Sequence, residues 1–111
     1  MLQYETAKKL YEEIKTKSMA SPIEDFDEFY MEFLQDATDY ANNRLAWSFM
    51  DKAARAEDDS SRSIKHDAFM ARLNAICRVL KVEGIDEIMP DRKAKGDFAC
   101  YIALFLSLEQ R

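Results

Sequence analysis

The chain has 111 residues, which is enough for one hydrophobic core and too short for two, so we expect a single domain over 1–111. Apolar residues make up 48% and charged residues 33% of it, a balance typical of a folded protein rather than a disordered one. The net charge of −5 weighs against nucleic acid and anionic membranes as partners. Only two glycines and two prolines occur, too few for the many turns of a β-sandwich, which favours a few long helices.

The start of the chain and its cysteines bear on where the protein works. Neither a basic nor an apolar segment follows the first methionine, so a secretory signal is not expected. The most apolar run, Phe98 to Leu106, is about half the length that a membrane-spanning helix needs. Cys77 and Cys100 lie far apart among apolar residues, as expected of reduced thiols in a core. The sequence therefore predicts a cytoplasmic protein without a membrane partner.

Two helices are predicted in the N-terminal half. The first runs from Leu2 to Lys17, where apolar residues recur at helical spacing opposite charged ones. The second is expected to begin at Pro22, because the Ser21 hydroxyl can cap it and Glu24 stands three residues after that cap. This helix carries one stripe of apolar residues: Phe26, Phe29, Tyr30, Phe33, Ala37, Tyr40 and Ala41.

The apolar stripe of the second helix changes phase near Asn42. The stripe that follows is rotated by roughly half a turn and consists of Leu45, Ala46, Phe49, Met50 and Ala53. Because one straight helix cannot bury both stripes against one core, we expect a kink between Tyr40 and Arg44 in a compact monomer. A straight helix from Pro22 to Glu57 would instead need a second chain to cover the second stripe, so the expected state is a monomer or a homodimer.

A polar stretch separates the second predicted helix from the third. Residues Glu57 to Arg62 are charged or carry hydroxyl groups, and we expect them to form a connection outside any helix. The third helix then runs to Leu80. Gly84 supplies the left-handed residue that commonly follows a helix end.

The last predicted helix supplies the core of the bundle. It follows a short turn over residues 85–89 and starts between Asp91 and Asp97. Because residues 98–106 are apolar on nearly every side, this helix should lie at the centre of an all-α bundle of four to five helices. The residues expected to be almost fully buried are Phe98, Ile102 and Phe105.

Few side chains in this sequence are suited to catalysis. His66 is the only histidine, so one chain cannot assemble a zinc or di-iron site from histidine motifs; beside Asp67 in a first helical turn, it is expected to face solvent. No serine stands in a glycine-rich elbow, and neither glycine belongs to a phosphate-binding loop. The short basic cluster Arg92, Lys93 and Lys95 is interpreted as ordinary surface. The sequence thus indicates no catalytic residue and no cofactor.

An acidic row is the sharpest candidate for a functional site. No lysine or arginine occurs from Ser18 to Asn43, whereas seven carboxylates do. Four of these follow one another at spacings of four, four and three residues and so share one helix face: Glu28, Glu32, Asp36 and Asp39. We refer to these four residues as the acidic row. A basic partner protein is one expected occupant; alternatively, Lys8, Lys15 or Arg72 crosses from another helix and makes the row structural.

A magnesium site is the second interpretation of the acidic row. Carboxylate oxygens suit this hard ion, and a small helical hydrolase could use such spacing. The site would need further carboxylates from a second helix, for which the sequence offers only Glu12 and Glu13 nearby. The favoured function is therefore a non-enzymatic protein-interaction or regulatory protein of the immunity, antitoxin-like or phage-associated class. A magnesium-dependent helical hydrolase is the alternative.

Overall fold

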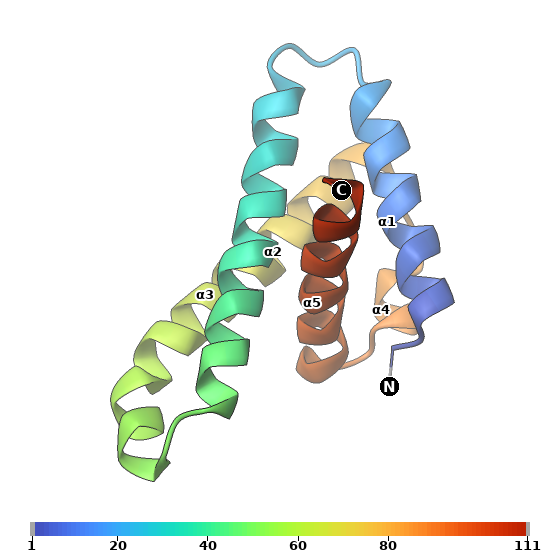
Figure 1. The fold of residues 1–111 in the computed structure, drawn as a ribbon. Helices are drawn as coiled ribbons and strands as arrows, with labels where there is room; N and C mark the ends of the chain where they lie inside the picture. The colour runs from blue at the N-terminus through green and yellow to red at the C-terminus, as the bar shows by residue number, and fades with distance from the viewer. Residues whose placement is uncertain (1, 111) are drawn as a thin grey trace.

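Five α-helices make up the part of the chain that the structure, a computed structural model, describes (residues 2–110), and no strand occurs there. The helices are α1 (Tyr4–Met19), α2 (Phe26–Ser48), α3 (Lys52–Leu80), α4 (Ile85–Ile88) and α5 (Arg92–Glu109). In Figure 1, α5 lies in front between α1 and α2, and α3 crosses behind α2. The predicted all-α bundle is confirmed. No helix within residues 2–110 combines the length and apolar content of a membrane span.

The inner face of α5 forms the centre of the core. Phe98, Ile102 and Phe105 are buried, as predicted, and α5 contacts α1, α2 and α3. Aromatic rings link three helices: the ring centroids of Phe33 and Phe69 are 5.9 Å apart, and those of Phe69 and Phe98 are 6.5 Å apart. Such a run of buried rings contributes apolar burial together with favourable ring geometry.

Polar contacts connect α1 to the far end of α5. The Tyr11 hydroxyl donates to Glu109 Oε2 at 2.8 Å, and Lys15 Nζ lies 2.7 Å from Glu109 Oε1. Burial, followed by the hydrogen bond to Glu109, raises the pKa of Tyr11. The hydrogen bond from Lys15 lowers the pKa of Glu109. At the other end of α1, the Tyr101 hydroxyl donates to the Leu2 carbonyl oxygen at 3.2 Å.

The second helix begins later than the sequence predicted. It starts at Phe26 rather than at Pro22, and the Ser21 hydroxyl accepts from the backbone N–H of Ile23 at 3.2 Å instead of closing a capping box. Asp25 precedes the helix with φ of 60°, an uncommon conformation for a residue with a side chain. Phe26 is buried. The packing of this ring thus decides where the helix begins, and the local capping signal is overridden.

The predicted kink between Tyr40 and Arg44 is wrong. The second helix continues without interruption to Ser48, and the chain reverses direction over residues 49–51. Asp51 then caps α3, because its side chain accepts from the backbone N–H of Ala54 at 2.8 Å. The boundary between α2 and α3 therefore lies at the first strong N-cap, Asp51, and not where the apolar stripe changes phase.

The polar stretch from Glu57 to Arg62 lies inside α3, so the predicted connection is also wrong. Residues 42–65, the end of α2 and the beginning of α3, form a helical hairpin that extends away from the core at the lower left of Figure 1; we call it the arm. Among these residues only Asn43 is buried. Its amide donates to Asp58 at 3.0 Å. The stretch is polar because this part of the helix is solvated on most sides.

The chain leaves α3 through Lys81 rather than Gly84. Lys81 has φ of 58°, and the backbone N–H of Val82 returns to the Cys77 carbonyl at 2.9 Å, which closes the helix end. Gly84, with φ of 80°, instead precedes the short α4. The fifth helix begins at Arg92, within the range predicted, with Asp91 as its cap.

Candidate functional site

The acidic row is divided by an arginine from α3. Arg72 lies 2.8 Å from a Glu32 oxygen and 3.1 Å from an Asp36 oxygen. The same guanidinium lies over the Phe29 ring, 5.2 Å from its centroid. Arg72 is one of the three cations that the sequence offered for an internal neutralisation, and it therefore makes Glu32 and Asp36 part of the α2–α3 packing.

The other two carboxylates of the row remain at the surface. Glu28 and Asp39 are exposed and lie within 4 Å of no basic side chain among residues 2–110. Asp39 accepts only from the Gln35 amide, at 2.8 Å. Half of the acidic row is thus available to a partner.

Two double substitutions should separate these halves. E32Q/D36N is expected to lower the free energy of unfolding by about 1 kcal/mol, since it leaves the Arg72 charge without its carboxylates. The matched variant E28Q/D39N should leave stability unchanged or a few tenths of a kcal/mol higher, because it removes repulsion between like charges. Thermal denaturation of both measures the difference. Equal changes in stability for the two variants would mean that Arg72 does not stabilise the fold through Glu32 and Asp36.

The geometry does not favour the magnesium interpretation. The group that faces Glu32 and Asp36 from the neighbouring helix is a guanidinium, whereas a metal site needs further oxygen ligands there. Within residues 2–110 no three carboxylate, histidine or cysteine side chains come together as a metal would require. Glu32 and Asp36 thus contact a guanidinium in this arrangement, as an internal neutralisation of the row requires.

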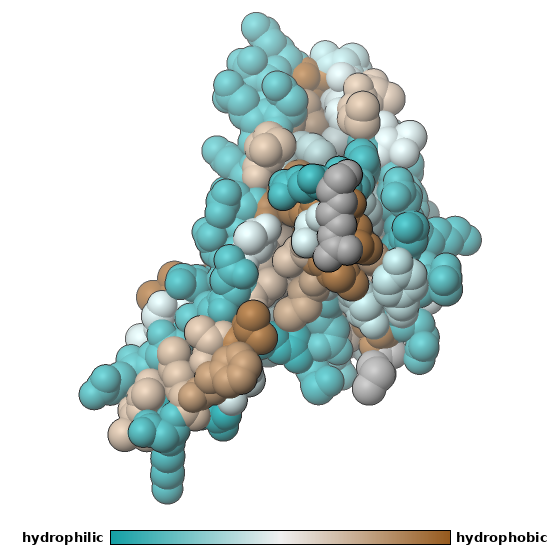
Figure 2. All heavy atoms as spheres, viewed as in Figure 1, coloured by the Kyte–Doolittle hydropathy of each residue, from teal (hydrophilic) through white to brown (hydrophobic). Residues whose placement is uncertain are grey.

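The outer face of α5 is not covered by any other helix. Leu104 is 43% exposed and Leu108 42% exposed, although the segment is apolar on nearly every side. On the neighbouring α2, Met31 and Leu45 are each 61% exposed, and Phe49 at the tip of the arm is 84% exposed. Figure 2 shows apolar side chains gathered over α5 and along the arm. This apolar face is larger than isolated surface leucines would produce.

Two shallow hollows, bordered by Met31 and Leu45 respectively, form a groove between α2 and α5, which we call the α2–α5 groove. One hollow of about 330 Å³ lies between Met31 and Leu106, and a second of about 400 Å³ lies between Leu45 and Cys100. Ala103 borders both. The two helices run antiparallel, so the groove follows them over much of their length. Aliphatic side chains and polar ones line it in similar numbers.

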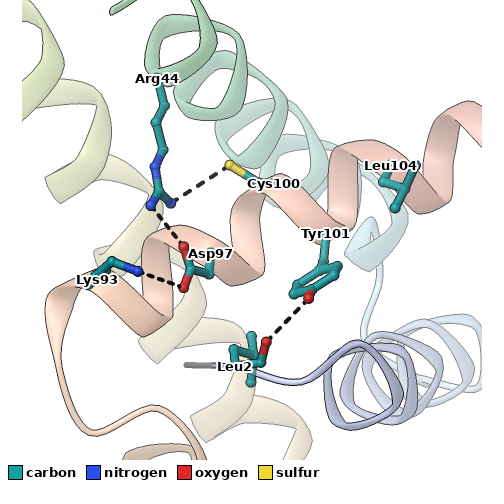
Figure 3. Close-up of a pocket in the computed structure, with 7 residues that line it drawn as sticks. All are labelled: Leu2, Arg44, Lys93, Asp97, Cys100, Tyr101 and Leu104. Carbon is teal, nitrogen blue, oxygen red and sulfur yellow. Dashed lines mark hydrogen bonds and ion pairs between the residues drawn. The ribbon is translucent and has the colours of Figure 1, made fainter. Parts of the chain in front are cut away.

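A third hollow of about 350 Å³ continues the groove towards the N-terminus of α1. Figure 3 shows Arg44 pointing to Asp97 and to the Cys100 thiol, at 2.8 and 3.8 Å. Burial raises the pKa of Cys100, and the nearby Arg44 opposes this shift. Burial likewise raises the pKa of Cys77, to about 12. Both thiols are therefore protonated near neutral pH, and neither is activated as a nucleophile.

His66 is buried, and the expectation that it faces solvent is wrong. It is 4% exposed, its Nε2–H donates to the Arg92 carbonyl oxygen at 3.1 Å, and its ring packs edge-on against Tyr40 at 4.8 Å. Burial lowers its pKa, which keeps the imidazole neutral near neutral pH. Sequence reasoning missed this because the covering residue, Arg92, comes from the start of another helix.

No protein-family model matches this chain, and no curated protein or solved structure matches it either. Function is therefore argued from the α2–α5 groove and the acidic row. The sequence indicated the row but not the groove. An apolar helix is expected to be central, and only the packing shows that one of its faces lies open.

Proposed function

We propose that this protein is a non-enzymatic interaction module whose α2–α5 groove receives an amphipathic helix of a basic partner protein. The observation that carries the proposal is the pair of hollows between α2 and α5, which share Ala103 and are bordered by the exposed Met31 and Leu45 of α2. Grooves between two helices commonly bind the apolar face of a third helix. From Met31 to Ser48 the groove runs along about 26 Å of helix, which suits a partner helix of about 17 residues.

Charge indicates the chemistry of the partner. Glu28 and Asp39 stand on the α2 face beside Met31 and Gln35, so they flank the groove. Lysines or arginines beside the apolar stripe of the incoming helix would meet these carboxylates. Such pairs at the edge of an interface speed association and set orientation more than they add affinity.

A second copy of the chain fits the groove less well than a basic partner. Each copy carries a net charge of −5 and presents the same acidic row, so two copies repel one another as they approach. A homodimer would also leave the exposed carboxylates of the row without cations. Light scattering is expected to show a monomer, and a stable dimer built on this groove would overturn the proposal.

The test introduces a charge into the middle of the groove. Ala103→Arg fills the point where the two hollows meet and repels basic helices, and Ala71→Arg makes the same change on an exposed position of α3. Both variants should melt within about 2 °C of the unaltered protein. The candidate partners are host proteins that the unaltered protein and the Ala71→Arg variant capture. The Ala103→Arg variant should not capture them.

The captured segment is then tested as a synthetic peptide. We expect at least a 30-fold loss of affinity with Ala103→Arg, no change with Ala71→Arg, and amide shifts confined to the groove. E28Q/D39N should slow association, most clearly at low salt. A partner that binds Ala103→Arg as tightly as the unaltered protein would refute the groove as its site.

A further inference from the structure

A second, polar pocket lies beside Arg44, on the side of this residue that faces α3, and it shares Arg44 with the α2–α5 groove. It has a volume of about 540 Å³ and is enclosed by α2, α3 and the beginning of α5. Small-molecule sites commonly have volumes of about 300–1,000 Å³. Four cationic side chains line it: Arg44, Arg62, Arg92 and Lys93. In a chain with net charge −5, this concentration of positive charge is a local reversal. We call it the basic pocket.

Within residues 2–110, two carboxylates lie within 4 Å of these four cations. Asp97 lies 2.8 Å from Arg44 and 3.6 Å from Lys93, and Asp67 lies 3.0 Å from Arg92. Four positive charges against two negative ones leave an excess of two. An anion with two negative charges would balance the basic pocket.

The placement of the cations is unfavourable without an anion. Arg92 and Lys93 occupy the first turn of α5, where the positive end of the helix dipole disfavours positive side chains. Arg62 lies over the Trp47 ring, 4.6 Å from its centroid, and its Nε is buried without a hydrogen-bond partner among residues 2–110. Both features are relieved by an acceptor oxygen in the pocket.

The only histidine of the chain also lines this pocket. His66 is 4% exposed. Its Nδ1 has no hydrogen-bond partner among residues 2–110, and the Asp67 Oδ1 atom is 3.9 Å away from it. A buried polar atom without a partner is uncommon in a folded protein. Because Nε2 carries the proton of the neutral imidazole, Nδ1 is an acceptor, and it calls for a hydrogen-bond donor from outside the described chain, such as the O–H group of a protonated anion or of water.

We propose that the basic pocket binds a small phosphate-bearing anion. Arginine side chains hold phosphate oxygens through pairs of N–H donors. A phosphate group carries about −1.5 to −2 charges near neutral pH, which is close to the excess, and pyrophosphate carries more. A free small anion is favoured over a nucleic-acid strand, because the pocket is bounded by three helices and the rest of the molecule is acidic.

The chain carries its own probes for the test. Trp47 is its only tryptophan and His66 its only histidine, and both line the basic pocket. Titration with pyrophosphate at 0.15 M salt should give saturable changes in Trp47 fluorescence and in the His66 ring signals. Inorganic phosphate should produce the same changes with lower affinity, because it offers fewer oxygens and less charge.

Two matched charge removals decide the result. R92Q/K93Q alters exposed side chains of the pocket and should weaken pyrophosphate binding at least tenfold without a fall in melting temperature. K52Q/R78Q removes two exposed charges elsewhere and should change binding less than twofold, since salt screens distant charges. Absence of saturable pyrophosphate binding, or equal binding by R92Q/K93Q, would overturn the proposal. So would tighter binding of a phosphoserine peptide than of pyrophosphate, which would assign the pocket to a phosphorylated protein.

Discussion

Replacing Phe105 with alanine is expected to lower the free energy of unfolding by about 3–5 kcal/mol. The ring is 3% exposed, and its centroid lies 5.2 Å from that of Tyr11 and 6.0 Å from that of Tyr101. Truncation removes the apolar burial of the ring and these ring contacts, and it leaves a cavity between α1 and α5. A loss of this size is a large part of the stability of an ordinary domain. Urea denaturation measures it.

The neighbouring residue provides the matched control. Leu104 lies on the outer face of α5 and is exposed, so Leu104→Ala should lower the free energy of unfolding by less than about 1 kcal/mol. The two substitutions thus separate the two faces of one helix. A Phe105→Ala protein with unchanged stability would show that α1 and α5 do not pack as described.

Amide hydrogen exchange should divide α3 into two parts. Within the arm, residues 57–62 of α3 are expected to exchange at least about 100-fold faster than residues 73–77 of the same helix. The reason is that Leu73, Ile76 and Cys77 are buried in the core, whereas the arm buries only Asn43. The arm can therefore open without breaking the core. Mass spectrometry of exchanged peptides, or NMR of single amides, measures the ratio.

The Phe105→Ala protein gives this experiment its control. Its core amides should lose protection in proportion to the lost stability, because they exchange through nearly global unfolding. The arm amides should be unaffected, since they exchange through a local opening. Equal protection along the whole of α3 would contradict the description of the arm as a separately opening unit.

The helices were predictable because each buries a face whose period is visible in the sequence. The core residues of α5 and the start of that helix follow from the apolar run and from Asp91. The arm was not predictable in this way. Its solvated helix resembles a loop in composition, and the change of phase near Asn42 reflects a part of α2 that leaves the core and not a bend.

The acidic row and the basic pocket could also be predicted only in part from the sequence, for a different reason. The sequence contained the acidic row and named Arg72 among three cations that could reach it, but only the crossing of α2 and α3 selects Arg72. Arg92 and Lys93 gave no local sign of a pocket. These two residues line a pocket because α5 begins beside His66. Arg92, the first residue of α5, stands twenty-six positions after this histidine in the chain.

The contact between α1 and α5 also orders events during synthesis. The first helix leaves the ribosome early, but its packing surface includes Phe105, and its polar contacts end on Glu109. The hairpin of α2 and α3 joins neighbouring segments and can form while translation continues. Until α5 emerges, the apolar side of α1 stays open to chaperones and to other nascent chains. The time between the synthesis of α1 and that of α5 therefore sets how long the unfinished protein is exposed to aggregation.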